Sequence, residues 1–298
     1  MDKLFILSTK AGNGEFDEFS KEILKVYKDH NRQDEVHVLM TEYKDHAKDA
    51  AREFIKENPE NKLLIACGGD GTLNELANVL AGTKASLGLI PMGTGNDFSK
   101  NFDYSNFKIE DSFEPRISPI DLIKVNDSLC INVLSLGFDT HILEKTYELL
   151  EEDPKLKEKA FTKAVRQSIF KLEAEDLELD ILDSNNEKKT IKGQFLISAI
   201  CNGGFYGSGF NPAPSSKIDD GLLNLILVDK MPLLRVLPLV LKYKKGTHIN
   251  HPKVKEYLIK EGTIRSEKLL TANIDGEIFK AKEIKIKILE KAINFAYF

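Results

Sequence analysis

The sequence has no excess of positive charge and no cysteines in a metal-binding spacing. Lys and Arg number 42 against 47 Asp and Glu, which leaves a net charge of -5. Because these charges are scattered, the chain lacks the basic field that nucleic-acid binding requires, and we expect no nucleic-acid partner. The cysteines lie far apart in apolar runs without CxxC or Cys/His spacing: Cys67, Cys130 and Cys201. Buried free thiols in a reducing compartment fit this pattern best.

The sequence also has no apolar run long enough to cross a membrane. The most apolar segment, residues 231–241, is interrupted by Pro232, Arg235 and Pro238, whereas a membrane span needs about 20 mostly apolar residues. The first residues show no basic leader followed by an apolar stretch. We therefore expect a cytoplasmic protein whose contact with a membrane is peripheral, at its inner face.

The sequence does contain the composition of an ordinary globular protein. Hydrophobic residues make up 42% and charged residues 30% of the chain, which allows a sizeable core. A length of 298 residues favours two domains with a cleft between them, and one large domain is the alternative. The oligomeric state is not defined by the sequence, and a homodimer is one arrangement that it allows.

Strand and helix patterns alternate over the first hundred residues. Apolar runs at 4–7, 36–40, 63–67 and 87–90 are accompanied by helical spacing at 16–26 and 47–55. This alternation predicts a parallel sheet covered by helices. In such sheets ligands bind at the carboxyl ends of the strands.

After about residue 117 the pattern changes to many β-prone runs, interrupted by helical stretches at 140–150 and 161–172. Strands are expected at 120–125, 129–136, 177–182, 195–201 and 222–228, with more up to the terminus. This half therefore predicts an antiparallel sheet or sandwich. We predict two domains, an α/β domain at 1–115 and an all-β sandwich domain at 116–298, with the last residues packing back on the first.

The strongest motif is a glycine-rich loop, Gly68-Gly69-Asp70-Gly71-Thr72-Leu73-Asn74-Glu75, between a buried strand and an amphipathic helix. Successive glycines let backbone amides form an anion-binding nest, and a helix amino terminus adds positive dipole. The alternative is a tight turn with a capping box between Thr72 and Glu75. Capping does not explain three glycines around an acid, so the loop predicts phosphate binding.

A second loop, Pro91-Met92-Gly93-Thr94-Gly95-Asn96-Asp97-Phe98, also follows a strand and precedes a short helix. By itself it is equally well explained as a plain turn, because Gly and Asn favour turns. Two such loops at neighbouring strand ends would converge on one polyphosphate. The pair therefore favours a nucleotide.

Together the two loops resemble the diacylglycerol-kinase-type catalytic fold of bacterial diacylglycerol kinases and eukaryotic sphingosine and ceramide kinases. Further segments are similar to the same family: Thr41-Glu42, Gly137-Phe138-Asp139, Cys201-Asn202-Gly203-Gly204, Asp219-Asp220-Gly221 and Asp275-Gly276-Glu277. The resemblance covers nearly the full length. Kinases of the NAD-kinase type use a similar glycine turn, but they lack this second-domain pattern.

The resemblance implies an amino-terminal domain that holds ATP and a carboxyl-terminal domain that contributes acids across the cleft. Asp70 would hold Mg²⁺ and the phosphates, while Glu277 or Asp275 would accept the proton of a lipid hydroxyl. The residues expected around the nucleotide are Thr9, Lys10, Gly12, Thr41, Gly68, Gly69, Gly71, Thr72, Asn74, Thr94, Gly95 and Asn96. A hairpin turn is the alternative for Asp275-Gly276-Glu277, and both interpretations can hold at once.

The resemblance also implies a structural Mg²⁺ at the second-domain turn. Its ligands would be the Asp220 carboxylate and the carbonyl groups of Lys217 and Leu222, and oxygen ligands suit this hard cation. An ordinary turn is the alternative.

The first loop departs from the family, which usually has Asn-Pro-x-x-Gly and a basic residue after the first strand. Here the loop reads Ser8-Thr9-Lys10-Ala11-Gly12-Asn13-Gly14. Lys10 supplies the cation if its side chain turns inward, and it is a solvated surface lysine otherwise. Nucleotide affinity, and with it activity, depends on this loop.

An apolar slot is needed for the acceptor lipid. The helical patterns near Leu149 and at 161–170, together with residues 233–241, offer apolar faces, although such faces usually pack the core. Nearby basic residues could contact anionic headgroups, or could simply be solvated: Lys155, Lys157, Lys159, Lys163, Arg166, Lys242, Lys244 and Lys245.

The sequence thus predicts an ATP-dependent lipid kinase with Mg²⁺ as cofactor and a membrane lipid as substrate, with diacylglycerol first. The alternatives are a kinase for a sphingoid base, a monoacylglycerol or phosphatidylglycerol, or a nucleotide-sensing homologue without turnover.

Overall fold

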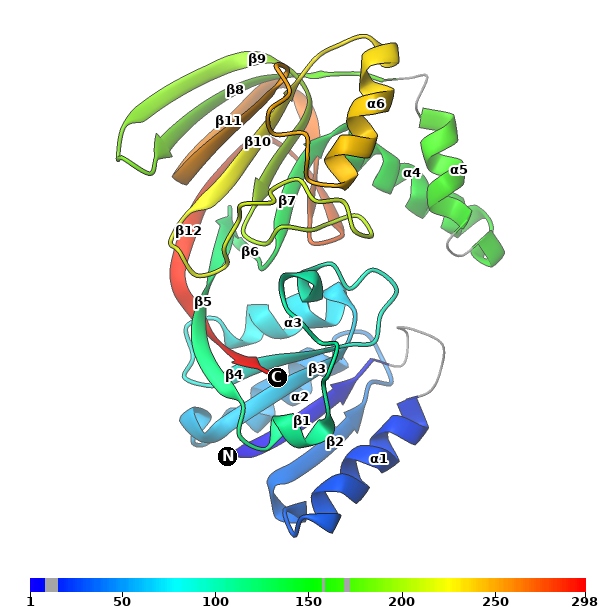
Figure 1. Cartoon of the computed structure of the whole chain (residues 1–298), viewed down its shortest axis with the longest axis vertical. Coiled ribbons are helices and arrows are strands. Elements are labelled where there is room, and N and C mark those ends of the chain that lie inside the picture. Colours follow the sequence, from blue (N-terminus) through cyan, green and yellow to red (C-terminus); the bar gives the residue numbers. More distant parts are fainter. Residues whose placement is uncertain (9–15, 157–158, 169–171) are drawn as a thin grey trace.

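The computed structural model describes residues 1–8, 16–156, 159–168 and 172–298. Figure 1 shows two lobes, an α/β lobe that holds both chain termini and a β-rich lobe above it. The two lobes share one continuous hydrogen-bonded sheet. The predicted fold class, an α/β domain followed by an antiparallel β domain, is confirmed.

The α/β lobe is built on four parallel strands in the order β4-β3-β1-β2. Its strands are β1 (Asp2–Leu7), β2 (Val36–Met40), β3 (Lys62–Gly68) and β4 (Ser86–Pro91). Its helices are α1 (Phe16–Asp29), α2 (His46–Phe54) and α3 (Asp70–Leu80). Alternate residues of β1 enter opposite cores, Phe5 with α1 and Ile6 with α2 and α3, because successive side chains of a strand point to opposite faces.

This lobe and the segment between β4 and β5 also contain short 3₁₀ helices: Gln33–Glu35, Pro59–Asn61, Phe98–Asn101 and Ile109–Ser112. One local prediction is wrong. Helix α3 begins at Asp70, with Gly69 as its N-cap and no capping side chain. Thr72 therefore lies inside the first turn and forms no capping box with Glu75, because the helix starts three residues earlier than the box requires.

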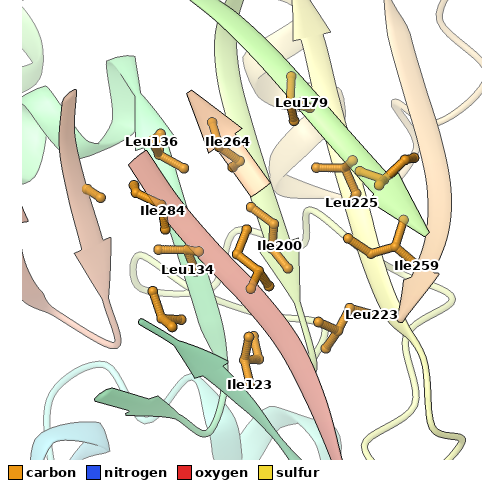
Figure 2. Packing of buried hydrophobic residues seen from close by; sticks show 14 of the residues in the cluster. Ile123, Leu134, Leu136, Leu179, Ile200, Leu223, Leu225, Ile259, Ile264 and Ile284 are labelled. Atoms are coloured by element: carbon orange, nitrogen blue, oxygen red, sulfur yellow. The ribbon is translucent and has the colours of Figure 1, made fainter. Parts of the chain in front are cut away.

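The second lobe is antiparallel. Its strands are β7 (Val133–Gly137), β8 (Glu175–Asp183), β9 (Lys188–Cys201), β10 (Leu223–Asp229), β11 (Val254–Ile274) and β12 (Glu277–Tyr297). One apolar cluster fills the space that these strands enclose (Figure 2), with Leu134, Leu179, Ile200, Leu225 and Ile264 among its members. The expected strand at 129–136 is two strands, since β6 (Ser128–Cys130) ends before β7.

Three helices cover the other face of this lobe. They are α4 (Phe138–Glu152), α5 (Lys159–Ser168) and α6 (Leu233–Lys244), with a 3₁₀ turn at Pro154–Leu156. Helices α4 and α5 pack on each other, and α6 packs on β9 and β10. Among the described residues, no helix is long and apolar enough to cross a membrane.

Strands β5 (Arg116–Val125) and β12 connect the lobes. They pair along their length, and Asn294–Ala296 of β12 also pairs in parallel with Ser86–Gly88 of β4. The end of the chain therefore lies in the first lobe. The division at residues 115 and 116 stays a prediction, since β5 itself passes from one lobe to the other.

All three cysteines are buried free thiols, as expected.

Candidate active site

The carboxyl ends of the four parallel strands meet at one edge of the sheet. Ser8 N–H donates to the Cys67 carbonyl (3.1 Å), and Thr41 N–H donates to the Leu7 carbonyl (2.9 Å). Thr41 therefore lies beside the end of β1. Thr9, Lys10 and Gly12, which follow β1 in the sequence, lie outside the described residues.

The two glycine loops contact each other directly. Met92 N–H donates to the Gly68 carbonyl (2.9 Å), and Gly93 N–H donates to the same oxygen (3.2 Å). A Cβ at Gly93 would lie 2.5 Å from the Cα of Gly69, so the backbones touch where only glycine fits. Gly68 is equally confined, because a Cβ there would lie 2.8 Å from Thr72 Oγ1. The sequence predicted this convergence.

The second loop is closed by its own asparagine. Asn96 has φ 48°, and its side chain accepts from Gly93 N–H (2.9 Å) and donates to the Gly93 carbonyl (2.6 Å). These bonds occupy the amide that the sequence assigned to the nucleotide. Thr94 is exposed at the tip of the loop, and Gly95 lies against the Asp70 carboxylate.

Asp70 joins the first loop to the second. Its carboxylate accepts hydrogen bonds from the amides of Asp97 and Phe98, both 2.9 Å long. These amides are at the start of the 3₁₀ helix Phe98–Asn101. Burial raises the pKa of Asp70, and the two amides oppose that rise. The two amide bonds thus hold the Asp70 side chain in place at the start of α3, next to both loops.

Asp97 was quoted in the motif but given no role, and it links the two lobes. Its carboxylate accepts from the amides of Ser208 (2.8 Å) and Gly209 (2.7 Å) of the second lobe, and from Lys100 Nζ (2.6 Å). Asn101 adds a bond from Gly204 N–H to its side-chain oxygen (2.9 Å). The signal in the sequence was an acid directly after a glycine loop, but its partners in the second lobe are over 100 residues away.

Asp275 and Gly276 form the two-residue turn between β11 and β12. Their φ angles are 47° and 99°, and positive φ at both positions is typical of a type I′ hairpin. The Asp275 carboxylate accepts hydrogen bonds from the amides of Ile131 (2.7 Å), Asn132 (3.1 Å) and Val133 (2.9 Å). Asp275 is therefore a partly buried anchor that fixes the turn. The hairpin interpretation holds.

Burial raises the pKa of Asp275 to about 6 from 3.8, and the amides of Val133 and Ile131 oppose the rise. Because the folded state binds this proton more tightly than the unfolded state, the stability that Asp275 contributes falls as the pH rises from about 4 to about 6. We expect the free energy of unfolding of the wild type, relative to Asp275→Asn, to fall over this window by up to about 3 kcal/mol. Denaturant unfolding of both proteins across the window measures it, and a difference that rises or stays level contradicts the prediction.

Glu277 follows the turn and is exposed. It lines a polar cavity of about 350 Å³ together with Lys48 and Arg52 of α2 and Asn74 and Glu75 of α3. Burial raises the pKa of Glu75, and the nearby Glu277 charge adds to that rise while Lys48 lowers it. The structure therefore brings the predicted base next to the helix that starts at the first glycine loop.

A second cavity of about 310 Å³ has a largely apolar lining in the second lobe and a polar end at the lobe boundary. Asp70, Asp97, Asn132 and Asp275 line this polar end. Helices α4, α5 and α6 and strands β9 and β10 supply its apolar wall, which includes Phe138, Ile142, Phe161, Val165, Leu196, Val228, Val236, Leu239 and Val240. The 275–277 turn contributes residues to both cavities.

Asp139 also lines the apolar cavity, on the side of the second lobe. Asp139, at the start of α4, accepts a hydrogen bond from Tyr206 Oη (2.6 Å), and burial raises the pKa of Asp139. Tyr206 belongs to the segment whose Ser208 and Gly209 amides bind Asp97. The first domain, the bridging segment and the wall of the cavity are thus joined by consecutive hydrogen bonds.

The turn at Asp220 was predicted to hold a structural metal. Asp220 is exposed and accepts a hydrogen bond from Leu222 N–H (3.1 Å), which an ordinary turn also provides. Within the described residues no group of three or more His, Cys, Asp or Glu side chains could hold a metal. The predicted site has a single carboxylate, from Asp220, and takes its other ligands from the carbonyl groups of Lys217 and Leu222. A search for such groups therefore does not test it, and the structural metal stays a prediction.

Comparisons with known proteins agree with this geometry. The diacylglycerol kinase catalytic domain matches residues 2–125, and the YegS C-terminal NAD kinase beta sandwich-like domain matches residues 132–297. A probable lipid kinase YegS-like protein of Klebsiella pneumoniae is 31% identical over 269 residues, with 87% of this chain and 85% of the relative covered. A diacylglycerol kinase of Staphylococcus saprophyticus is 30% identical over 238 residues, covering 77% and 75%.

The fold is also similar to that of solved structures. The crystal structure of a diacylglycerol kinase from Bacillus anthracis superposes with a TM-score of 0.72 at 19% identity, covering 100% of this chain and 97% of that chain. With two domain models side by side over almost the whole length, the chain belongs to the diacylglycerol kinase family of lipid kinases.

Proposed function

We propose that the protein transfers the γ-phosphoryl group of ATP to the hydroxyl group of a membrane lipid, with diacylglycerol as the first candidate. Membership of a kinase family implies the use of ATP. The glycine loops after β3 and β4 provide the phosphate-binding backbone, because their amides cluster where a helix amino terminus adds positive dipole.

The observation that carries the proposal is the apolar cavity that reaches Asp70 and Asp97 at its polar end. A hydroxyl group at the polar end would lie next to the phosphate-binding loops, while the adjoining methylene groups occupy the apolar part. Each buried methylene contributes about 0.8 kcal/mol, so such a site selects acceptors with long hydrocarbon chains over sugars or nucleosides. Its volume of about 310 Å³ is at the lower end for ligand sites, so much of a lipid's tails would stay outside.

The Asp70 and Asp97 carboxylates at the polar end of the cavity suit Mg²⁺. Asp70 Oδ2 and Asp97 Oδ2 both lie within 4 Å of the Cβ position at Gly95, and the Asp97 charge contributes to the raised pKa of Asp70. Hard carboxylate oxygens are the ligands that Mg²⁺ prefers. When bound, the cation would neutralise charge on the transferring phosphoryl group. Asp70 and Asp97 are the residues that would hold it.

Glu277 is the residue that we assign as proton acceptor. The lipid oxygen forms a bond to the γ-phosphorus, the bond from that phosphorus to the β–γ bridging oxygen breaks, and ADP leaves. The hydroxyl proton passes to the Glu277 carboxylate, which is exposed next to the turn. Asp275 is less suited to this role, because its oxygens already accept three amide bonds. Its role would be to position the turn.

Other acceptors fit the same chemistry. A sphingoid base, a monoacylglycerol or phosphatidylglycerol also offers a hydroxyl group next to hydrocarbon. A nucleotide-sensing protein without turnover is the alternative of another class, and it is motivated by the altered loop at Ser8 to Gly14.

Incubation of the purified protein with γ-labelled ATP, Mg²⁺ and vesicles that each contain one candidate lipid tests the proposal. We expect the label in a lipid product, with diacylglycerol giving the highest turnover. Transfer to another lipid alone would correct the substrate and keep the reaction. Tight ATP binding without transfer to any of them would support the nucleotide sensor and overturn the kinase.

A further inference from the structure

Helix α6 has two apolar faces, and only one of them is covered by the protein. Val236, Leu239 and Tyr243 point inward and are buried. On the other side Leu234, Leu237 and Leu241 are 83%, 45% and 67% exposed. Their spacing of three and four residues places them on one side of the helix. A row of exposed leucines on a helix marks a contact site with another apolar phase.

The segment that contains this helix carries charge of one sign. Residues 231–255 contain no Asp or Glu, although the whole chain has a net charge of -5. Arg235, Lys242, Lys244 and Lys245 are exposed, and none of them forms an ion pair with any residue that the structure describes. A leucine row bordered by unpaired cations is complementary to an anionic lipid surface.

The neighbouring helix extends the basic border. Phe161 and Val165 of α5 line the same cavity as Val236 and Val240 of α6, so both helices flank it, and Figure 1 shows them at one end of the second lobe. The exposed side of α5 carries Lys159, Lys163 and Arg166. The basic residues picked out in the sequence on these two helices therefore lie on the outer side of helices that line one cavity. Lys157, from the same predicted set, lies outside the described residues.

We propose that the outer face of α6, formed by Leu234, Leu237 and Leu241, docks on an anionic phospholipid bilayer. The leucines enter the interface between headgroups and acyl chains, while the cations contact the headgroups. The inner face of the same helix forms the cavity wall, so docking brings the cavity to the bilayer surface. A lipid can then place its reacting end in the cavity while its tails remain largely in the membrane.

Vesicle sedimentation without nucleotide tests the docking surface. The full chain is mixed with phosphatidylcholine vesicles or with vesicles that also contain phosphatidylglycerol. We expect binding at least ~10-fold stronger to the anionic vesicles, given the contribution of each surface cation. Leu234→Gln/Leu241→Gln should weaken that binding at least ~10-fold, since both leucines leave the apolar phase. Lys242→Gln/Lys245→Gln should remove the preference for anionic vesicles.

Leu269→Gln is the matched control, because Leu269 is 58% exposed on β11 and belongs to no such row. It should bind vesicles like the wild type. Thermal unfolding checks that every variant keeps its fold. Vesicle binding by the α6 leucine variant equal to that of the wild type overturns the proposal. So does a wild-type dimer that this variant dissociates without any loss of vesicle binding, because the face would then join two copies.

This inference does not depend on the proposed reaction, and the two fail separately. Vesicle binding that is lost in the α6 variant, combined with no phosphoryl transfer in the wild type, would strike only the proposed function. Conversely, we expect the α6 leucine variant to phosphorylate a short-chain, water-soluble acceptor at the wild-type rate. Its turnover should fall only with vesicle-borne lipid.

Discussion

Replacing Glu277 by Gln should lower turnover at least ~100-fold, which is the scale of losing one positioned general base. Gln keeps the shape of the side chain but cannot accept the hydroxyl proton at neutral pH. Because Glu277 is exposed, the melting temperature should stay at the wild-type value. Steady-state phosphorylation of vesicle-borne lipid, with ATP affinity measured separately, gives both parameters. The loss should appear in kcat and leave ATP binding unchanged.

Glu75→Gln is the matched control for this effect. Glu75 comes from α3 and lines the same polar cavity as Glu277, so its replacement changes the charge of the cavity by the same amount. A loss below about tenfold is expected, on the scale of a screened electrostatic contribution. Equal losses of turnover in the two variants would show that only the negative charge of the polar cavity matters. Near-full activity of Glu277→Gln would show that Glu277 is not the base. Asp275→Asn should instead lower activity together with stability, since it releases the 131–133 backbone.

The second large effect is expected at the contact between the glycine loops. In Gly93→Ala the new methyl group would lie 2.5 Å from Gly69 Cα and 2.9 Å from both Gly69 N and Asn96 Oδ1. Backbone cannot move away as a flexible side chain can, so the loops must separate. We expect a loss of about 1–3 kcal/mol in the free energy of unfolding, typical of overpacking. ATP affinity should fall at least ~10-fold, because misplaced binding groups lose much of their effect.

Gly71→Ala provides the comparison within the same loop. A Cβ at Gly71 meets no atom within 4 Å, and Ala is favoured over Gly in a helix by about 1 kcal/mol. Its stability should therefore equal or exceed that of the wild type. Denaturant unfolding and ATP titration of both variants separate loop packing from a general intolerance of methyl groups. Gly93→Ala with wild-type stability and ATP affinity would show that the contact between the loops is dispensable.

The elements were predictable from the sequence where the pattern is local. Residues 36–40 and 63–67 form strands within a residue or two of the expected ends, because short apolar runs bounded by polar residues have few other ways to be buried. The contact between the two glycine loops was predictable for a similar reason, since glycine at those positions allows two backbone segments to lie close together. The capping box at Thr72 and Glu75 was wrong, because Gly69, which has no capping side chain, starts α3 instead.

The partners of the acids were decided by tertiary structure. Asp275 was considered as a base, and its burial against the amides of residues 131–133 favours a positioning role. Asp97 received no role from the motif, and its bonds to Ser208 and Gly209 make it a link between the lobes. Neither relation is visible in a local sequence pattern, because the paired groups are 111 to 144 residues apart.

By itself the sequence determined the fold class and the convergence of the two glycine loops, because hydrophobic period and backbone permissiveness are properties of short segments. Only the tertiary structure decided which acid is exposed and which is held by backbone amides, that the apolar cavity reaches Asp70 and Asp97, and that α6 presents leucines to solvent. These features depend on which surfaces remain uncovered after distant elements pack, and a local pattern carries no information about its distant neighbours.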